Sequence, residues 1–214
     1  MSELLLSAKD IDCERDDRLL FHRLSFDVCA GDLVQIEGPN GSGKTSLLRI
    51  LSGLSRHFEG EFLWKGQEAA HQSEDFYQNL LYFGHKPGVK AALTPRENLA
   101  WYAAMYPTQP DISIDHALAK VGLSGFEDVP CRALSAGQQR RVSLARLHIS
   151  ASQLWVLDEP FTAIDKQGVA EQEALIAQHA ANGGAVIITT HHALNGKGDI
   201  KKINLADFAL EADA

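Results

Sequence analysis

The sequence predicts an α/β fold in which strands and helices alternate along the chain. Two unbroken apolar runs, LWVLD at 154–158 and AVIITT at 185–190, have the pattern of strands buried on both faces. A helical stretch separates them and ends near Gly183 or Gly184, either of which can adopt the left-handed conformation that terminates a helix. A glycine-rich loop between a predicted strand and a predicted helix repeats the alternation earlier in the chain, and this order is typical of an α/β core.

The first elements of the core surround that glycine-rich loop. The runs LSFDV at 24–28 and LVQIE at 33–37 are separated by the turn CAGD, and their alternating apolar residues predict a β-hairpin. A helix is expected over 44–51, where leucine and isoleucine side chains supply a buried side. The segment GEFLWKG at 60–66 predicts a further short strand and a turn.

The middle of the chain has the apolar periodicity of helices. Thr94 at the N-cap, Pro95 at the first helical position and Glu97 three residues after the cap form the pattern of a capping box. Two more helices are expected at about 114–121 and 138–149. These segments predict a mostly helical stretch inserted in the α/β core.

Length and charge bound the possible functions. At 214 residues the chain has the size of one domain, 1–214, with the helical insert at roughly 72–150. The formal net charge of −8 leaves no broad basic field, so no nucleic-acid partner is expected. No apolar run approaches the roughly 20 residues that a membrane span needs, and the N-terminus lacks the pattern of a signal peptide. Any role at a membrane is therefore expected to come through a partner protein.

Cysteines and histidines do not indicate a disulfide framework or a transition-metal site. The three cysteines, Cys13, Cys29 and Cys131, lie far apart, as is typical of reduced thiols in a cytosolic protein. None of the nine histidines lies four residues from another, and no His-Glu-x-x-His occurs.

The segment EGPNGSGKTSLL contains the P-loop pattern Gly-x-x-x-x-Gly-Lys-Thr. Its glycines let successive backbone N–H groups approach phosphate oxygens, and the following helix points its positive end at the same anion. Lys44 then supplies a charge at the β- and γ-phosphates, and the Thr45 hydroxyl is a ligand for Mg²⁺, so the expected cofactor is Mg²⁺ with ATP. The expected ATP-binding residues are Gly38, Pro39, Asn40, Gly41, Ser42, Gly43, Lys44, Thr45 and Ser46. The glycine- and lysine-containing segment NGKGD at 195–199 lacks the strand and helix and predicts a surface turn.

Two predicted strands end in residues suited to phosphate chemistry. Asp158 and Glu159 follow the run LWVLD, at the strand end where open α/β sheets bind ligands. Asp158 is suited to the Mg²⁺ shell, and Glu159 to orienting and polarising a water molecule. His191 ends the other strand and can hold the γ-phosphate, the water and Glu159 in line, whereas His192 points away if the strand continues. Taken alone, an acidic pair before a proline is also common where a strand leaves a sheet, and a histidine at a strand end is often only exposed to solvent. These assignments therefore depend on the P-loop.

The segment LSAGQ starts a predicted helix with a hydroxyl and small residues. Ser135, with the backbone of Ala136, Gly137 and Gln138, forms a second anion-binding helix start, or else a plain N-cap. Because the P-loop already surrounds the phosphates in its own subunit, a second site is useful if it faces the nucleotide of another copy. Two chains packed head to tail would then enclose two ATP molecules.

The motifs occur in a fixed order: P-loop, LSAGQ, LWVLDEP, FTAID and TTHH. Together they resemble the ATP-binding subunits of ABC transporters over nearly the whole chain. The resemblance implies a P-loop NTPase fold of the ABC ATPase type, with a mixed sheet core, an antiparallel β subdomain and an inserted helical signature subdomain. It also implies that LSAGQ is the signature motif acting in trans, that Glu159 is the catalytic carboxylate and His191 the switch histidine, and that Asp165 lies in the D-loop at the dimer seam. The implied activity is ATP hydrolysis coupled to transport, by an ATP-dependent dimer bound to integral-membrane subunits through the insert.

Three positions depart from the family pattern. Ala136 replaces the first glycine of LSGGQ, which is tolerable unless the backbone there has positive φ. The Q-loop glutamine position falls on His85 or Lys86, and neither is an amide. The aromatic residue that stacks on adenine is missing, and Arg15 is the candidate to stack its guanidinium there.

The stretches QIEGPNGSGKTSLLRILSGL, EPFTAID and VIITTHHAL further resemble the haem exporter ATPase of bacterial cytochrome c maturation. That resemblance implies a peripheral subunit at the cytoplasmic face of the bacterial inner membrane, whose ATP turnover serves haem delivery to a periplasmic haem chaperone. The alternatives are an ABC ATPase subunit for another cargo, such as a drug, lipid or peptide, and a non-transport ABC ATPase acting on DNA or ribosomes. The acidic charge and the single cassette weigh against the last.

Overall fold

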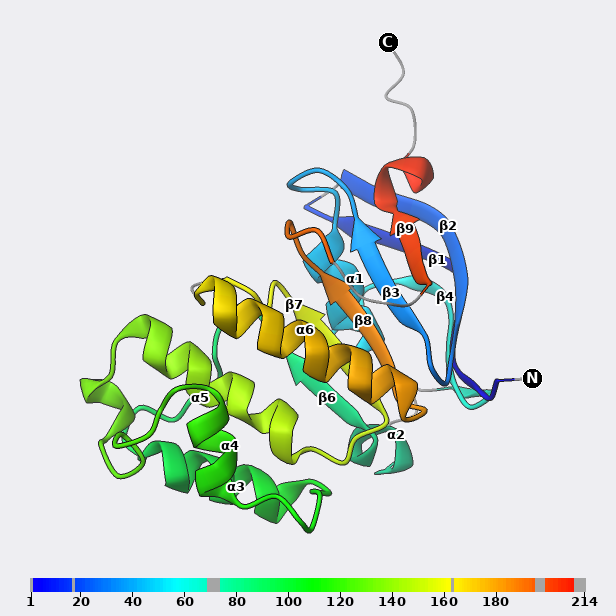
Figure 1. Ribbon diagram of the computed structural model, residues 1–214. Helices are drawn as coiled ribbons and strands as arrows, with labels where there is room; N and C mark the ends of the chain where they lie inside the picture. The colour runs from blue at the N-terminus through cyan, green and yellow to red at the C-terminus, as the bar shows by residue number, and fades with distance from the viewer. Residues whose placement is uncertain (1, 17, 69–73, 163, 195–198, 210–214) are drawn as a thin grey trace.

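An antiparallel sheet contains the beginning of the chain. The computed structural model describes residues 2–16, 18–68, 74–162, 164–194 and 199–209 (Figure 1). The sheet has the strand order β2-β1-β4-β5 and consists of β1 (Leu4–Arg15), β2 (Arg18–Cys29), β4 (Glu59–Trp64) and β5 (Gln67–Glu68). It is the antiparallel part that the sequence predicts, and β4 and β5 confirm the strand and turn expected around GEFLWKG.

A second sheet is parallel and forms the centre of the molecule. Its strand order is β6-β7-β8-β3-β9, and each pairing within it is parallel. The strands are β3 (Leu33–Glu37), β6 (Leu80–Phe83), β7 (Leu154–Asp158), β8 (Ala185–Thr189) and β9 (Ile200–Asn204). Every residue of β7 and β8 is buried, as the two apolar runs predict. The α/β class with a separate antiparallel sheet is therefore confirmed, whereas the core sheet, expected to be mixed, is parallel in its described pairings.

The predicted hairpin of β2 and β3 is wrong. β2 pairs with β1, whereas β3 lies between β8 and β9 in the other sheet. The turn CAGD carries the chain from one sheet to the other: the Cys29 N–H donates to the Asp32 carboxylate at 2.7 Å, and the Gly31 N–H donates to the Gly184 carbonyl at 2.7 Å. Alternation of apolar residues identifies strands but not their partners, because pairing depends on the rest of the sheet.

The central part of the chain supplies most of the remaining helices. They are α2 (Glu74–Gln78), α3 (Pro95–Met105), α4 (Ile114–Lys120) and α5 (Ala136–Ile149). The capping box before α3 is present, since Thr94 Oγ1 accepts a hydrogen bond from the Glu97 N–H and the Glu97 carboxylate accepts one from the Thr94 N–H. Helix α5 starts at Ala136 rather than at Gln138. Strand β6 lies within the range predicted for the insert yet pairs with β7 of the parallel sheet, and helices α3, α4 and α5 follow it.

The parallel sheet separates two apolar cores. Helix α1 (Lys44–Leu51) and helix α6 (Lys166–Ala181) cover opposite faces of the sheet, as Figure 1 shows. Val156 and Ile187 point into the core shared with α1 and the antiparallel sheet, whereas Trp155 and Ile188 point into the core shared with α5 and α6. Alternate residues of one strand thus serve different cores, which is why the strand sequences are apolar throughout.

Gly183, rather than Gly184, has the left-handed conformation after α6, with φ of 89°. Residues 195–198 of the predicted NGKGD turn lie outside the described residues. In the part of the chain that the structure describes, no helix has both the length and the apolar character needed to cross a membrane.

Candidate functional site

The P-loop connects β3 to α1, as the sequence predicts. Gly38 and Gly43 have φ of 144° and 96°, a region that favours glycine. A Cβ atom on Gly38 would lie 2.6 Å from the Ser42 hydroxyl, and one on Gly43 would lie 3.0 Å from the Phe21 ring. These glycines therefore allow a tight loop that side chains would block.

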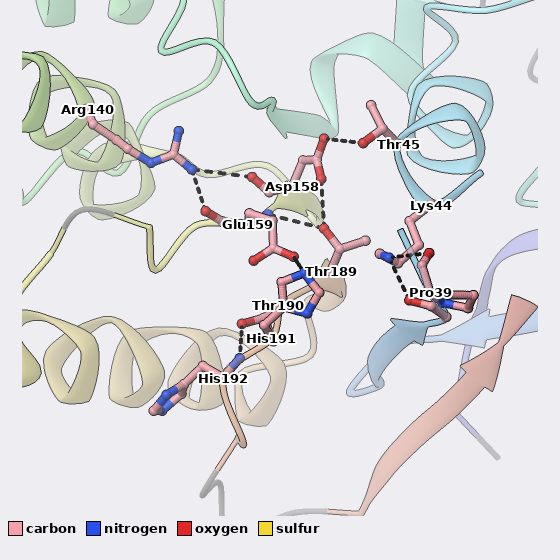
Figure 2. Close-up of polar contacts among 11 residues, drawn as sticks. Pro39, Lys44, Thr45, Arg140, Asp158, Glu159, Thr189, Thr190, His191 and His192 are labelled. Carbon is pink, nitrogen blue, oxygen red and sulfur yellow. Dashed lines mark hydrogen bonds and ion pairs between the residues drawn. The ribbon is translucent and has the colours of Figure 1, made fainter. Parts of the chain in front are cut away.

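Several groups in the loop suit an anion. No side chain within the described residues caps the start of α1, so its first N–H groups remain available to a ligand. The Ser42 Oγ atom is buried without a hydrogen-bond partner in the described structure. Lys44 extends its ammonium group across the loop, donating to the carbonyls of Gly38 at 2.7 Å and Pro39 at 3.0 Å (Figure 2). Backbone donors, an unpaired hydroxyl and a lysine charge together fit the phosphates of a nucleotide.

Asp158 connects the P-loop helix to the central strands. Its carboxylate accepts hydrogen bonds from Thr45 Oγ1 at 3.0 Å and from Thr189 Oγ1 at 2.8 Å (Figure 2). Hard oxygen ligands of this kind are those that Mg²⁺ prefers. Among the described residues there is no group of three or more His, Cys, Asp or Glu side chains able to hold a metal ion. Thr45 and Asp158 thus fit a Mg²⁺ ion that takes its other ligands from phosphate and water, as Mg²⁺ commonly does.

Glu159 follows β7 with an unusual backbone conformation. Its φ is 51°, in the left-handed region, where a residue other than glycine costs about 1 kcal/mol or more. The Glu159 N–H donates to both the carbonyl and the hydroxyl of Thr189 at 3.1 Å. The Glu159 side chain is 22% exposed, so its carboxylate reaches solvent at the carboxyl edge of the sheet. Strain of this kind is often found at functional sites.

The two adjacent histidines after β8 face different ways. The His191 Nε2 atom lies 3.6 Å from Glu159 Oε1 (Figure 2). The His192 Nε2 atom instead lies 3.4 Å from Glu173 Oε1 on α6. The expectation that only one of them faces the acidic pair is confirmed. The reason differs from the predicted one, because β8 ends at Thr189 and the histidines lie in a bend rather than a continuing strand.

The LSAGQ segment forms the start of α5. Ser135 Oγ accepts from the Gln138 N–H at 3.2 Å, and the Gln138 side-chain oxygen accepts from the Ser135 N–H at 2.9 Å, which makes a capping box. Ala136 is the first helical residue and is not among the residues with positive φ, so its methyl group is compatible with the backbone. Within one chain Ser135 therefore acts as an N-cap, and its action in trans stays a prediction.

The other predicted positions lie at a helix cap, at a strand end and in the loop after β6. Asp165 is the N-cap of α6 and accepts from the Gly168 N–H at 2.8 Å, so its D-loop role stays a prediction. Arg15 ends β1 beside Asp16 and is 71% exposed, and its stacking on adenine likewise stays a prediction. His85 and Lys86 follow β6, and the His85 carbonyl accepts a hydrogen bond from Arg140.

Arg140 is the site residue that the sequence reasoning missed. Its guanidinium lies beside the acidic pair and donates to the carbonyls of Asp158 and Glu159 (Figure 2). Burial lowers the pKa of Arg140, and the Asp158 and Glu159 carboxylates oppose that shift. The sequence signal for it is the arginine pair that follows LSAGQ after Gln139, at the start of a predicted helix.

Comparisons with known proteins agree with this geometry. The family model described as ABC transporter matches residues 21–162. A protein from Hahella chejuensis is 55% identical over 94% of this chain and 95% of its own length, and one from Pseudomonas putida is 53% identical over 96% and 99%. A third, from Yersinia pestis, is 52% identical over 95% and 94%, and all three are named cytochrome c biogenesis ATP-binding export protein CcmA.

Solved structures show the same fold at lower identity. A putative ABC transporter ATP-binding protein from Pyrococcus furiosus has a TM-score of 0.79 at 24% identity, over 95% of this chain and 98% of its own. An ATP-binding cassette solved as a dimer in a post-hydrolysis state, bound to ADP and phosphate, has a TM-score of 0.76 at 20% identity, over 88% of each chain.

Proposed function

The chain belongs to the ABC transporter family, and we propose that it is the ATP-hydrolysing subunit of a membrane complex that powers haem export for cytochrome c maturation. The observation that carries the ATPase activity is the convergence of the P-loop, Asp158, Glu159 and His191 at one edge of the parallel sheet. The cargo rests on relatives that share more than half of their residues with this chain and are named for cytochrome c biogenesis.

The residues divide the chemistry between binding and activation. The P-loop N–H groups and Lys44 bind the ATP phosphates, and Thr45 and Asp158 would hold Mg²⁺, which neutralises charge on the phosphate oxygens. Glu159 orients the attacking water and accepts its proton, because its carboxylate extends from the edge where the phosphates would lie. His191 lies beside Glu159 and keeps that carboxylate and the γ-phosphate in line.

A second copy completes the site in this proposal. The segment Ser135–Gln138 contacts the ATP of the partner copy, and Asp165 lies at the seam between the two chains. Support comes from the helix start at Ser135, whose backbone N–H groups suit an anion. Because the P-loop of the same chain already binds the phosphates of its own nucleotide, the anion at Ser135 would belong to the partner's nucleotide. Closure of the dimer around two ATP molecules and its reopening after hydrolysis would drive the membrane partner.

The membrane partner binds the helical insert in this proposal. Trp101 and Met105, one turn apart on α3, are 47% and 54% exposed, which gives the insert an apolar surface. The partner would be integral-membrane ABC subunits, and this chain a peripheral subunit at the cytoplasmic face of the bacterial inner membrane.

A haem stain of cells carrying variants of this gene tests the proposal. Glu159→Gln, installed in place of the wild-type gene, removes covalent haem from c-type cytochromes while b-type cytochromes persist, because only the former need haem delivered for attachment. His192→Gln is the matched control, since His192 faces α6 rather than Glu159, and it leaves the stain unchanged. Normal c-type bands in the Glu159→Gln strain would reject haem as the cargo and redirect the search to another exported molecule.

A further inference from the structure

Arg140 joins parts of the site that lie far apart in the sequence. It lies on α5, is 7% exposed, and donates from Nη1 to the His85 carbonyl at 3.0 Å. Its Nη2 donates to the carbonyl of Glu159 and, at 3.5 Å, to that of Asp158 (Figure 2). The guanidinium carbon lies 4.8 Å from the centre of the Phe83 ring, which adds a cation–π contact.

The surroundings of this arginine do not suit a purely structural role. In the described part of the chain its hydrogen-bond acceptors are backbone carbonyls, and it forms no ion pair with a carboxylate. Its Nε atom is buried without a partner there. Burying the guanidinium charge without a carboxylate partner lowers the stability of the fold, and an apolar side chain of similar volume would pack there at lower cost. A guanidinium is needed if its task is to hold several oxygens at once.

The group that Arg140 helps to fix is the backbone of Glu159. Thr189 accepts the hydrogen bond of the Glu159 N–H, and Arg140 donates to the Glu159 carbonyl, so both peptide groups of this residue are fixed. Between these two peptide groups Glu159 has a left-handed φ of 51°. Without the two hydrogen bonds the backbone would relax to a conformation of lower energy. The direction of the Glu159 carboxylate depends on that backbone conformation.

The same helix holds the loop after β6. Ser143, one turn after Arg140, donates to the Pro87 carbonyl at 2.6 Å, and Arg140 holds the His85 carbonyl. Both contacts use the backbone of the loop, so they do not depend on which side chain stands at position 85 or 86. The loop therefore stays attached to α5 even though His85 or Lys86 stands where the family has glutamine.

We propose that Arg140 is a positioning residue that couples the start of α5, with its LSAGQ segment, to Glu159 and to the loop at His85. A movement of α5 when Ser135 engages a nucleotide would pass through the guanidinium to the carbonyl of Glu159 and re-aim its carboxylate. This inference rests on the proposed ATPase function and adds to it a route by which the LSAGQ segment controls hydrolysis.

The test measures ATP binding and turnover separately, in the membrane complex purified through a tag on this chain. Arg140→Met lowers kcat by about 10²-fold, the scale of a misplaced reacting group, and leaves the Kd for ATP within about threefold. Arg140→Lys also lowers kcat, because a compact ammonium on a flexible stem lacks the planar fork that spans the His85 and Glu159 carbonyls. The matched control is Arg141→Met, whose guanidinium contacts the Gly122 carbonyl rather than the site and whose kcat stays near wild type.

A double variant separates positioning from a general loss of structure. If Arg140 acts through Glu159, adding Arg140→Met to Glu159→Gln lowers the residual rate no further. Additive losses, an unchanged kcat in both Arg140 variants, or an equal loss in Arg141→Met would overturn the inference. If Arg140→Met fails to fold, Arg140→Lys carries the same comparison with Glu159→Gln. Absence of ATP turnover in the wild-type complex would instead reject the proposed function.

Discussion

We predict that two histidines on the α5–α6 side of the sheet make the stability of this protein depend on pH. The His179 ring stacks on Trp155 with centroids 3.8 Å apart, and its Nε2 lies 3.2 Å from the Gln153 carbonyl. The His148 Nε2 lies 3.4 Å from the Gln172 side-chain nitrogen, a contact in which the imidazole accepts and is neutral. Burial lowers the pKa of each ring from 6.5 to about 4.

The sign of the effect follows from proton binding. Below pH 6.5 both histidines take up protons in the unfolded chain, whereas the folded chain excludes them until the pH nears 4. Stability therefore falls as the pH drops through this window. For each fully shielded histidine, proton linkage lowers the free energy of unfolding by about 2 kcal/mol between pH 7 and pH 5. Because both rings retain some solvent contact, we expect a loss of about 2 to 3 kcal/mol for the pair.

Urea unfolding monitored by circular dichroism at pH 7, 6 and 5 measures this loss. The double variant His148→Gln and His179→Gln should be less stable at pH 7 but should lose much less stability toward pH 5. His57→Gln is the control, since His57 is exposed on a loop after α1. An unfolding free energy that is flat between pH 7 and 5, or equal slopes in the double variant and the wild type, would refute the reasoning.

Three further predictions concern the nucleotide site. Lys44→Ala weakens ATP binding by about 10- to 100-fold, the value of a charge-assisted contact, and an unchanged Kd in a fluorescent-nucleotide titration would remove the P-loop assignment. Ser135→Arg, in a Glu159→Gln background, abolishes the ATP-dependent dimer seen by sedimentation and leaves ATP binding to the monomer intact. Ser113→Arg removes the equivalent cap of α4 and is its control; dimers that persist in Ser135→Arg would leave that residue as a cap alone. His85→Gln preserves ATP turnover, because the structure holds the His85 backbone carbonyl, and a loss of activity would give the imidazole a role of its own.

The sequence predicted the elements whose pattern is local. The apolar runs of β7 and β8 and the capping box before α3 are visible without any tertiary information. Strand β9 was missed because it is an edge strand with a polar surface: Lys201 pairs with Asp32 at 2.6 Å and Lys202 with Glu37 at 2.7 Å. Strand β6 was missed because a run of four residues resembles part of a buried helix.

The candidate site was predictable where its residues end strands of one sheet. Parallel strands bring their carboxyl ends to the same edge, so Asp158, Glu159 and His191 had to lie near the P-loop once the strands were assigned. Arg140 could not be found in the same way. Its acceptors are backbone carbonyls, which leave no trace in the pattern of side chains.

ATP turnover by the Glu159→Gln variant tests the central claim most directly. The protein should bind ATP with a Kd close to that of the wild type, because the P-loop and Lys44 are unchanged. Its hydrolysis rate should fall by about 10²-fold or more, the scale of a lost general base, and the variant should accumulate as an ATP-bound dimer. Turnover near the wild-type rate, with ATP still bound normally, would contradict the assignment of Glu159 as the residue that activates water.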